Sequence, residues 1–221
     1  MEPLTLEKVI LLVRDFLVVW ISQILYYNHI YPDESYEERS YMENVVFQTR
    51  VPALAEYLTS FANQMIKVLI EKDGGGKVHE IIVLIYDEAS LHVRKRYIAN
   101  FSQFVGLAGH FTSLDFLNGL LDAKLARLNL PDLTWPHLFT DLRSLMFFHI
   151  QELKRSELKM EPNIFFKLLL NMDGSVNLSL SENNVWAKIT LADDQRPMKY
   201  VPLGETSVGF VCFDIHNEYI P

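Results

Sequence analysis

The seven histidines of the chain are the side chains best suited to catalysis or to metal binding. None of them stands in an H-E-x-x-H arrangement or at the short spacing with which two ligands on one helix or hairpin hold zinc. His149 interrupts the apolar side of an expected helix, a position that favours a hydrogen-bonded core or rim histidine over a catalyst. The histidines therefore predict neither a metal site nor general acid–base catalysis.

Four other features could carry chemistry, and each has a simpler interpretation. Residues 74–77 read Gly-Gly-Gly-Lys, but a phosphate-binding loop needs a further upstream glycine and a Ser or Thr after the lysine, where this chain has Val78. The carboxylate pairs at residues 87–88 and 193–194 lie in expected turns, without a histidine or second acidic cluster to shift their pKa. Cys212 stands in an apolar run, which favours a small buried hydrophobic residue over a nucleophile. The sequence thus predicts no catalytic residue, no cofactor and no metal, and we expect that the chain is not an enzyme.

The composition narrows the class of protein further. The chain of 221 residues is 49% hydrophobic and 22% charged, which is typical of a globular protein. It has 20 Lys and Arg against 28 Asp and Glu, a formal net charge of -8. Because phosphate neutralisation supplies most of the affinity for nucleic acid, this charge argues against direct nucleic-acid binding. The length suits one domain, which we expect to span residues 1–221.

Signals for secretion and membrane insertion are weak. The single cysteine cannot form an internal disulfide, which suits a reducing compartment. The N-terminal residues lack the basic region of a signal peptide. The apolar run at residues 16–21 is far shorter than the roughly 18 residues that a membrane span needs. We therefore expect neither secretion nor a membrane partner.

Apolar residues recur at spacings of three and four in four segments, which predicts four helices. The first follows Thr5, a capping residue, and is apolar on nearly all sides, so we expect it in the centre of the core. The second begins at Pro52, which suits a first helical turn. The helices are expected over residues 5–28, from residue 52 to the glycine run, and over residues 113–128 and 136–158.

Strands are expected along the chain and dominate its last 60 residues. Residues 81–86 form an unbroken apolar run, typical of a strand that is buried on both faces. Residues 93–101 alternate, with Arg94 and Arg96 on one face, and predict the second strand of a hairpin. Further strands are expected at residues 44–49, 164–170, 176–180 and 208–215. Helices before strands in the chain predict the α+β class, with helices packed on a largely antiparallel sheet.

Several aromatic residues stand near the ends of expected elements rather than at periodic core positions. Aromatic side chains with a polar group are enriched at protein interfaces. A module that binds a peptide or partner is therefore the main alternative to an enzyme. The aromatic residues in question are Tyr31, Tyr36, Tyr41, Trp135, Trp186 and Tyr200.

The order of these segments, with several short strings in them, resembles the HORMA family. The first expected helix closes with Ile-Leu-Tyr-Tyr-Asn-His-Ile-Tyr-Pro at residues 24–32, which is similar to the end of the family's first helix. The helix opening at residues 51–57 and the strands at residues 81–86 and 94–101 follow in the family's order. The resemblance covers nearly the whole chain.

Within the family, the C-terminal part is most similar to the accessory subunit of translesion DNA polymerase zeta. The similarity rests on the string Tyr-Val-Pro-Leu-Gly-Glu-Thr-Ser at residues 200–207 and on the position of Trp186. Extra residues at about 106–133 depart from the animal form, which leaves open the self-association surface that the family has near the start of the next helix. A spindle-checkpoint or meiotic-axis HORMA protein remains the alternative, and an unrelated α+β enzyme is the third class left open.

The resemblance implies a non-catalytic adaptor that acts in DNA damage tolerance. A core of residues 1–172 is followed by a C-terminal belt and last strand, residues 173–221, and the belt closes over a partner peptide that adds as a strand to residues 164–170. The implied ligand is a proline-containing segment of the catalytic subunit of DNA polymerase zeta. Other translesion polymerases and HORMA proteins are further partners, and the nucleus, with the cytoplasm second, is the expected location. The implied peptide-binding residues are Tyr57, Phe166, Leu168, Trp186, Tyr200 and Leu203.

Overall fold

The protein is described from a computed structural model, which covers residues 5–70, 78–103, 134–156, 163–172, 197–208 and 211–220. The helix expected at residues 113–128 and the strand expected at residues 176–180 lie outside this part of the chain. The helices are α1 (Leu6–Tyr27), α2 (Pro52–Ile70) and α3 (Trp135–Arg155), with a 3-10 turn at Asp33–Ser35. The strands are β1 (Tyr36–Tyr41), β2 (Asn44–Thr49), β3 (Val78–Asp87), β4 (Val93–Asn100), β5 (Ile164–Met172), β6 (Lys199–Val208) and β7 (Val211–Tyr219).

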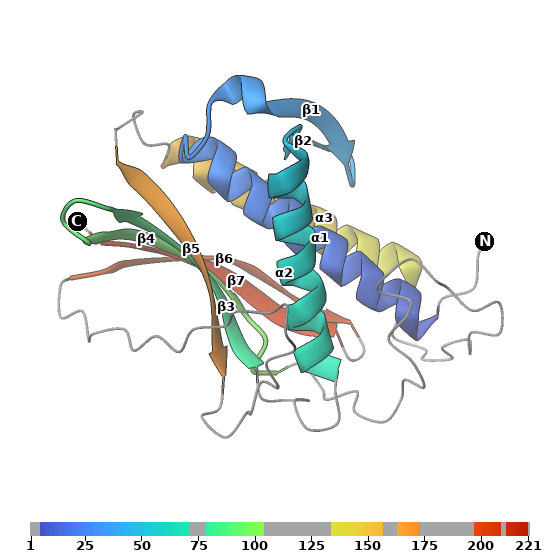
Figure 1. Ribbon diagram of the computed structural model, residues 1–221. Helices are drawn as coiled ribbons and strands as arrows, with labels where there is room; N and C mark the ends of the chain where they lie inside the picture. The colour runs from blue at the N-terminus through green and yellow to red at the C-terminus, as the bar shows by residue number, and fades with distance from the viewer. Residues whose placement is uncertain are drawn as a thin grey trace.

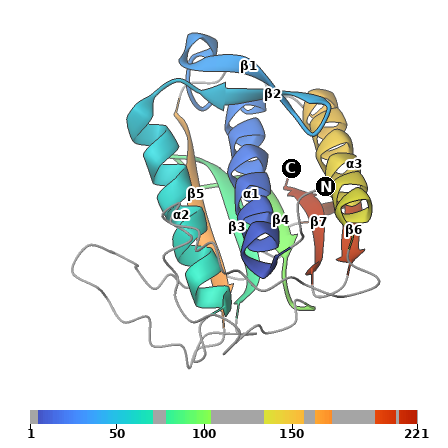
Figure 2. The same cartoon turned by 90° about the vertical axis from the view of Figure 1, so that its right-hand side faces the viewer.

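Helices and sheet form two layers (Figure 1). Five strands form an antiparallel sheet in the order β5-β3-β4-β7-β6, and the three helices lie on one face of it. Figure 2 shows α1 between α2 and α3, with the β1–β2 hairpin across one end of the helical layer. This arrangement confirms the predicted α+β class.

Helix α1 occupies the centre of the core, as its apolar sequence predicts. The Thr5 side chain accepts a hydrogen bond from the Lys8 N–H at 3.3 Å, which caps the N-terminus, and Asn28 caps the other end. The large indole of Trp20 is fully buried. By length and mean hydropathy, 1.9, this helix would also pass as a membrane span, but 67% of its apolar window is buried inside the fold. Burial among α2, α3 and the sheet accounts for the apolar surface.

The β1–β2 hairpin is the element that the sequence pattern did not predict in full. Its turn places Met42 and Glu43 at φ 47° and 58°, the left-handed conformation that a two-residue type I′ turn requires. Asn-Gly is the usual sequence in such a turn, and this chain has Met-Glu, so the sequence signal for a hairpin is missing. Contacts with α3 support the turn: Arg143 pairs with Glu43, and the Asn44 amide donates to the Arg143 carbonyl at 3.2 Å.

A buried glutamine joins this hairpin to α1. The Phe47 N–H donates to Gln23 Oε1 at 3.0 Å, and Gln23 Nε2 donates to the Phe47 carbonyl at 2.9 Å. Gln23 therefore hydrogen-bonds β2 as a neighbouring strand would, and this arrangement satisfies the backbone of Phe47.

Strands β3, β4 and β5 lie where the sequence predicts them, and the C-terminal strands do not. Alternation in β4 buries Lys95, Tyr97 and Ala99 toward the helices, as expected. The last strand runs over Val211–Tyr219 instead of residues 208–215, and β6 precedes it in a region for which no strand was expected. Pairing with β4 sets the register of β7, with Lys95 opposite Tyr219, and a local pattern does not contain this long-range partner.

Candidate peptide-binding edge

The sheet has two edge strands, β5 and β6, and they differ in their capacity to accept another strand. In β6, Pro202 has no N–H, Gly204 has φ 137°, and the pairing register shifts between these two residues. Proline and bulges protect an edge against added strands. In contrast, the sequence of β5, Ile-Phe-Phe-Lys-Leu-Leu-Leu-Asn-Met, contains neither proline nor glycine over nine residues. Strand β5 is therefore the edge suited to strand addition.

The side chains of β5 alternate between the two faces of the sheet. Phe166 and Leu168 point toward the helices, and Leu168 is buried with 9% of its surface exposed. Phe165 is 42% exposed, and the Lys167 ammonium lies 5.0 Å from the centre of the Tyr86 ring. A strand paired with β5 would continue this alternation, so half of its side chains would face the helical layer, next to Phe166 and Leu168.

An aromatic cluster, formed by Tyr31, Tyr57 and Phe166, lies beside this edge. The rings of Tyr57, on α2, and Tyr31, after α1, each lie 6.3 Å from the Phe166 ring in edge-to-face geometry. The Tyr57 side chain keeps 48% of its surface exposed. Partial burial raises the pKa of Tyr57, so its hydroxyl remains a hydrogen-bond donor at neutral pH. The cluster thus offers aromatic faces and a hydroxyl next to an open strand edge.

The structure brings together three of the six residues that the resemblance implies and places two others elsewhere. Tyr57 and Phe166 are in contact, and Leu168 follows along the same strand face. Trp186 lies outside the described residues. Tyr200 and Leu203 belong to β6, four strand spacings away, which is about 19 Å at 4.8 Å per strand. Tyr200 is 56% exposed and packs against the His216 ring at 4.7 Å.

Tyr31 is the member of the aromatic cluster that sequence analysis did not assign to the peptide site. Its sequence signals were its place among the aromatic residues near element ends and its position in the string that closes the first helix. The chain turns there, with His29 at φ 51°, and this turn directs Tyr31 toward β5. Only the packing of α1 on the sheet connects Tyr31 with Phe166, which is distant in sequence.

The side chains that the sequence offered for catalysis or metal binding lie in environments typical of a structural role. His149 is fully buried between the rings of Trp20 and Tyr97, and desolvation lowers the pKa of His149 to about 3, partly opposed by a backbone contact with Trp20. Cys212 is half-buried rather than buried as expected, and its thiol donates to Gln103 Oε1 at 3.3 Å. Within the described ranges, no three His, Cys, Asp or Glu side chains are placed to hold a metal ion.

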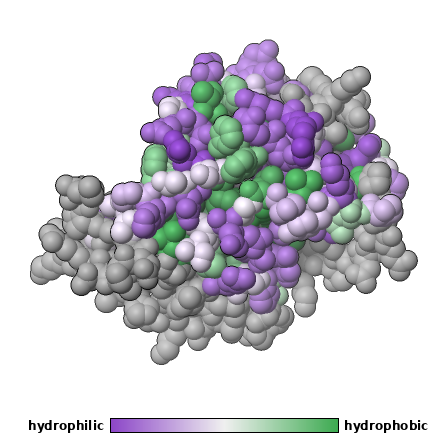
Figure 3. Space-filling model, turned by 180° about the vertical axis from the view of Figure 1, so that it is seen from behind, coloured by the Kyte–Doolittle hydropathy of each residue, from purple (hydrophilic) through white to green (hydrophobic). Residues whose placement is uncertain are grey.

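A second apolar surface lies on α3, on the side opposite the view of Figure 1. Phe139, Phe147 and Phe148 are 38%, 47% and 54% exposed. Figure 3 shows hydrophobic surface gathered near the middle of the rear face, with hydrophilic residues around it. This surface is separate from the β5 edge, because α3 packs on β6 at the opposite edge of the sheet.

Comparison with known proteins agrees with this architecture. The sequence profile of the HORMA domain matches residues 9–112, which include α1, the β1–β2 hairpin, α2, β3 and β4. The chain contains a HORMA domain. HORMA domains are non-catalytic adaptors, so the family match supports the prediction of a non-catalytic adaptor domain.

One curated relative is the DNA polymerase zeta processivity subunit of Arabidopsis thaliana. It is 35% identical over 81 residues, 37% of this chain, and the matched segment spans 36% of the length of that relative. Among solved structures, a chain of the mitotic checkpoint complex has a TM-score of 0.67 at 15% identity and covers 96% of this chain and 98% of its own. C. elegans HTP-1 bound to the HIM-3 closure motif has a TM-score of 0.63 at 11% identity, with 99% and 97% covered. At these identities the two structures show the HORMA fold alone.

Proposed function

We propose that this HORMA protein is the adaptor subunit of a translesion DNA polymerase zeta. In this role it captures a proline-containing peptide of the catalytic subunit by strand addition to β5, in the nucleus, during DNA damage tolerance. The observation that carries the proposal is the open β5 edge beside Tyr31, Tyr57 and Phe166. Backbone hydrogen bonds to β5 would supply affinity, and the aromatic cluster would supply sequence preference.

The aromatic cluster suits proline. A proline in an extended peptide has a fixed φ and loses little conformational entropy on binding. Its ring is apolar and stacks on aromatic faces, and Tyr57 offers such a face with 48% of its side chain still exposed. A proline also lacks an N–H. At the end of the added strand, where that N–H would have no partner in β5, a proline directed toward the cluster would therefore cost the peptide no hydrogen bond.

The polymerase assignment is supported by the Arabidopsis relative, whose name is that of a DNA polymerase zeta processivity subunit. The matched segment spans about a third of each protein, so the proposal extends beyond the aligned part. The β5 edge supports peptide capture in general, and the relative supports the identity of the captured partner.

The connection between the two sheet edges leaves room for a belt. Strands β5 and β6 run in the same direction at opposite edges, so the end of β5 and the start of β6 lie about 30 Å apart along the strands and about 19 Å apart across the sheet. Residues 173–196 make this connection and reach about 80 Å when fully extended. The surplus length can accommodate a peptide beneath the chain. Such a peptide would dissociate slowly relative to its affinity, because release requires the covering segment to move.

The alternative is a spindle-checkpoint or meiotic-axis HORMA adaptor. The solved structures that share the fold include a mitotic checkpoint assembly and HTP-1 with a closure motif, and their low identity gives no preference between partners. The two functions share strand addition and differ in the peptide that the chain selects.

Amide hydrogen exchange with two peptides tests both levels of the proposal. One peptide is the proline-containing segment of the polymerase zeta catalytic subunit from the same organism, and the other is a peptide of a checkpoint partner. We expect the polymerase peptide to bind more tightly and to protect outward N–H groups of β5, with β6 amides unchanged. Tighter binding of the checkpoint peptide would favour the alternative function, a checkpoint or meiotic-axis adaptor. Protection of β6 amides instead of β5 amides would contradict the proposed binding edge.

A further inference from the structure

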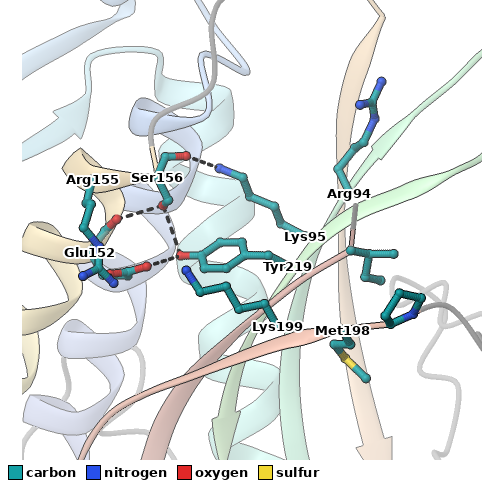
Figure 4. Close-up of a pocket in the computed structure, with 10 residues that line it drawn as sticks. Arg94, Lys95, Glu152, Arg155, Ser156, Met198, Lys199 and Tyr219 are labelled. Atoms are coloured by element: carbon teal, nitrogen blue, oxygen red, sulfur yellow. Dashed lines mark hydrogen bonds and ion pairs between the residues drawn. The ribbon is translucent and has the colours of Figure 1, made fainter.

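A cavity of about 870 Å³ lies near the β6 edge of the sheet, which is the edge opposite to β5 (Figure 4). It is formed where the ends of β4, β6 and β7 meet the C-terminal end of α3. The volume lies within the range of about 300 to 1,000 Å³ that is usual for ligand sites. Its main lining residues are Arg94, Lys95, Arg155, Met198, Lys199 and Tyr219.

Lys95 forms the base of the cavity and connects two helix ends. Its side chain is buried, with 5% exposed, and its ammonium donates to Asn28 Oδ1 at 3.0 Å and to the Ser156 carbonyl at 2.6 Å. Asn28 caps the C-terminus of α1 and Ser156 caps that of α3. Each helix C-terminus carries roughly half a negative charge, so one buried ammonium offsets both ends.

The carboxylates near the cavity are already engaged. Glu152 pairs with Arg155 and accepts a hydrogen bond from the Tyr219 hydroxyl at 3.1 Å, and its side chain is only 7% exposed. Asp87 lies 3.9 Å from Arg94, with 20% of its side chain exposed. Arg155 and Arg94, with 68% and 45% of their side chains exposed, are each more accessible than the carboxylate beside them, and Lys199 is exposed as well.

The charge of this cavity is opposite to that of the protein. Four cations, from Arg94, Lys95, Arg155 and Lys199, line it together with one carboxylate, Glu152. Arg155 is paired with Glu152, Arg94 lies near Asp87, and the two helix ends offset the buried Lys95. The exposed Lys199 therefore supplies most of the excess positive charge. The whole chain carries a net charge of -8. A local cationic site on an acidic protein attracts an anionic group of a partner. It repels cationic partner segments, which the acidic remainder of the surface attracts.

The cavity also has apolar walls. Pro197 and Met198 lie on one side, with Met198 45% exposed, and Ile220 and the Tyr219 ring lie nearby. A methionine side chain adapts its shape to different apolar groups. An ion or phosphate alone would leave this apolar surface in water, whereas a peptide with a large apolar side chain would cover it.

We propose that this cavity binds a segment of a partner protein that presents an acidic side chain next to a large apolar one. The carboxylate lies toward Lys199 and Arg94, and the apolar side chain packs on Met198 and Tyr219. The site is on the β6 side of the sheet, at the edge opposite to β5.

Titration of the full-length, isotope-labelled chain with short peptides tests this proposal by NMR. The first probe is the blocked peptide Asp-Glu-Leu-Phe-Asp-Glu. The second has Lys and Arg at the acidic positions, the third has glycines in place of Leu and Phe, and inorganic phosphate is the fourth. We expect saturable shifts at the amides of Lys199, Tyr219 and Ile220 with the first probe and at least tenfold weaker binding of the others. Equal binding of phosphate or of the basic peptide would overturn the proposal, as would shifts that map elsewhere.

Two matched variants separate this site from general charge effects. Lys199→Glu, at the cavity, should weaken binding of the acidic peptide about three- to tenfold, since it turns an attraction into a repulsion. Lys167→Glu makes the same charge change on exposed β5, at the opposite edge, and should leave affinity unchanged within about a factor of two. Equal losses of peptide affinity in both variants would show that the net charge of the protein causes the effect, and this result would contradict a specific site. Both lysines are exposed, so both variants should fold, which their melting temperatures will check.

Discussion

The ring of Tyr57 on α2 lies 6.3 Å from the ring of Phe166 on β5, in edge-to-face geometry. The contact joins a helix to the open edge of the sheet, and it leaves 48% of the Tyr57 side chain exposed. An aromatic residue that is anchored on one side and open on the other can contact a strand added to β5.

Tyr57→Ala should weaken capture of the polymerase peptide on the order of 30-fold, because a buried aromatic anchor contributes about 2 kcal/mol. The melting temperature should change little, since Tyr57 is half-exposed. Fluorescence anisotropy with a labelled peptide measures the affinity. Tyr200→Ala is the matched control, because Tyr200 is exposed to a similar degree, 56% against 48%, but lies at the opposite edge. If Tyr200→Ala weakened binding as much as Tyr57→Ala, the β5 edge would not be the binding site.

Lys95→Met should destabilise the fold by about 1 to 3 kcal/mol. The substitution keeps the length of the side chain but removes the donor to the Ser156 carbonyl and one of the two donors to Asn28 Oδ1, in a buried environment. Urea unfolding measures the loss. Lys199→Met, an exposed lysine near the same cavity, should change stability by less than about 0.5 kcal/mol. A loss of similar size in both variants would show that the helix ends do not depend on Lys95.

Stability should fall in acid partly through His149. Desolvation lowers the pKa of His149 from 6.5 to about 3, so the unfolded chain binds a proton there at pH values where the folded protein does not. The contribution to stability is complete above pH 6.5 and is lost as the pH falls toward 3. Between pH 7 and 4.5 the loss from this group should be about 2 to 3 kcal/mol.

His149→Leu should remove this part of the pH dependence, whatever its effect on stability at pH 7. The measurement is the free energy of unfolding in urea at both pH values. His92→Gln, which changes an exposed histidine, provides the control and should retain the dependence of the natural protein. An unchanged slope in His149→Leu would mean that His149 is protonated equally in both states.

Gly204→Ala should destabilise the C-terminal hairpin by about 1 to 3 kcal/mol. Gly204 has φ 137°, and an added Cβ would lie 3.1 Å from Leu145 Cδ2 on α3. Both the backbone conformation and the contact with α3 oppose a side chain here. Thermal unfolding measures the shift, with Ser207→Ala on the same strand as the control. A melting temperature equal to that of the control would show that β6 adjusts freely at its bulge.

The sequence alone determined the elements whose signals are local. Helices α1, α2 and α3 and strands β3, β4 and β5 lie close to the predicted segments, because capping residues and apolar periodicity act within a few turns or residues. The same local pattern put Phe166 and Leu168 on one face of a strand.

Only the tertiary structure decided which strand edge stays open and which aromatic residues meet there. The type I′ turn at Met42 and Glu43 lacks the usual Asn-Gly sequence and contacts Arg143, about a hundred residues away, so no local signal predicts β1. The placement of Tyr200 opposite to Tyr57 follows from the pairing of β7 with β4, which is equally non-local. Strand pairing joins distant residues through backbone hydrogen bonds that every sequence can form, so the sheet order depends on which long-range contacts bury the most apolar surface.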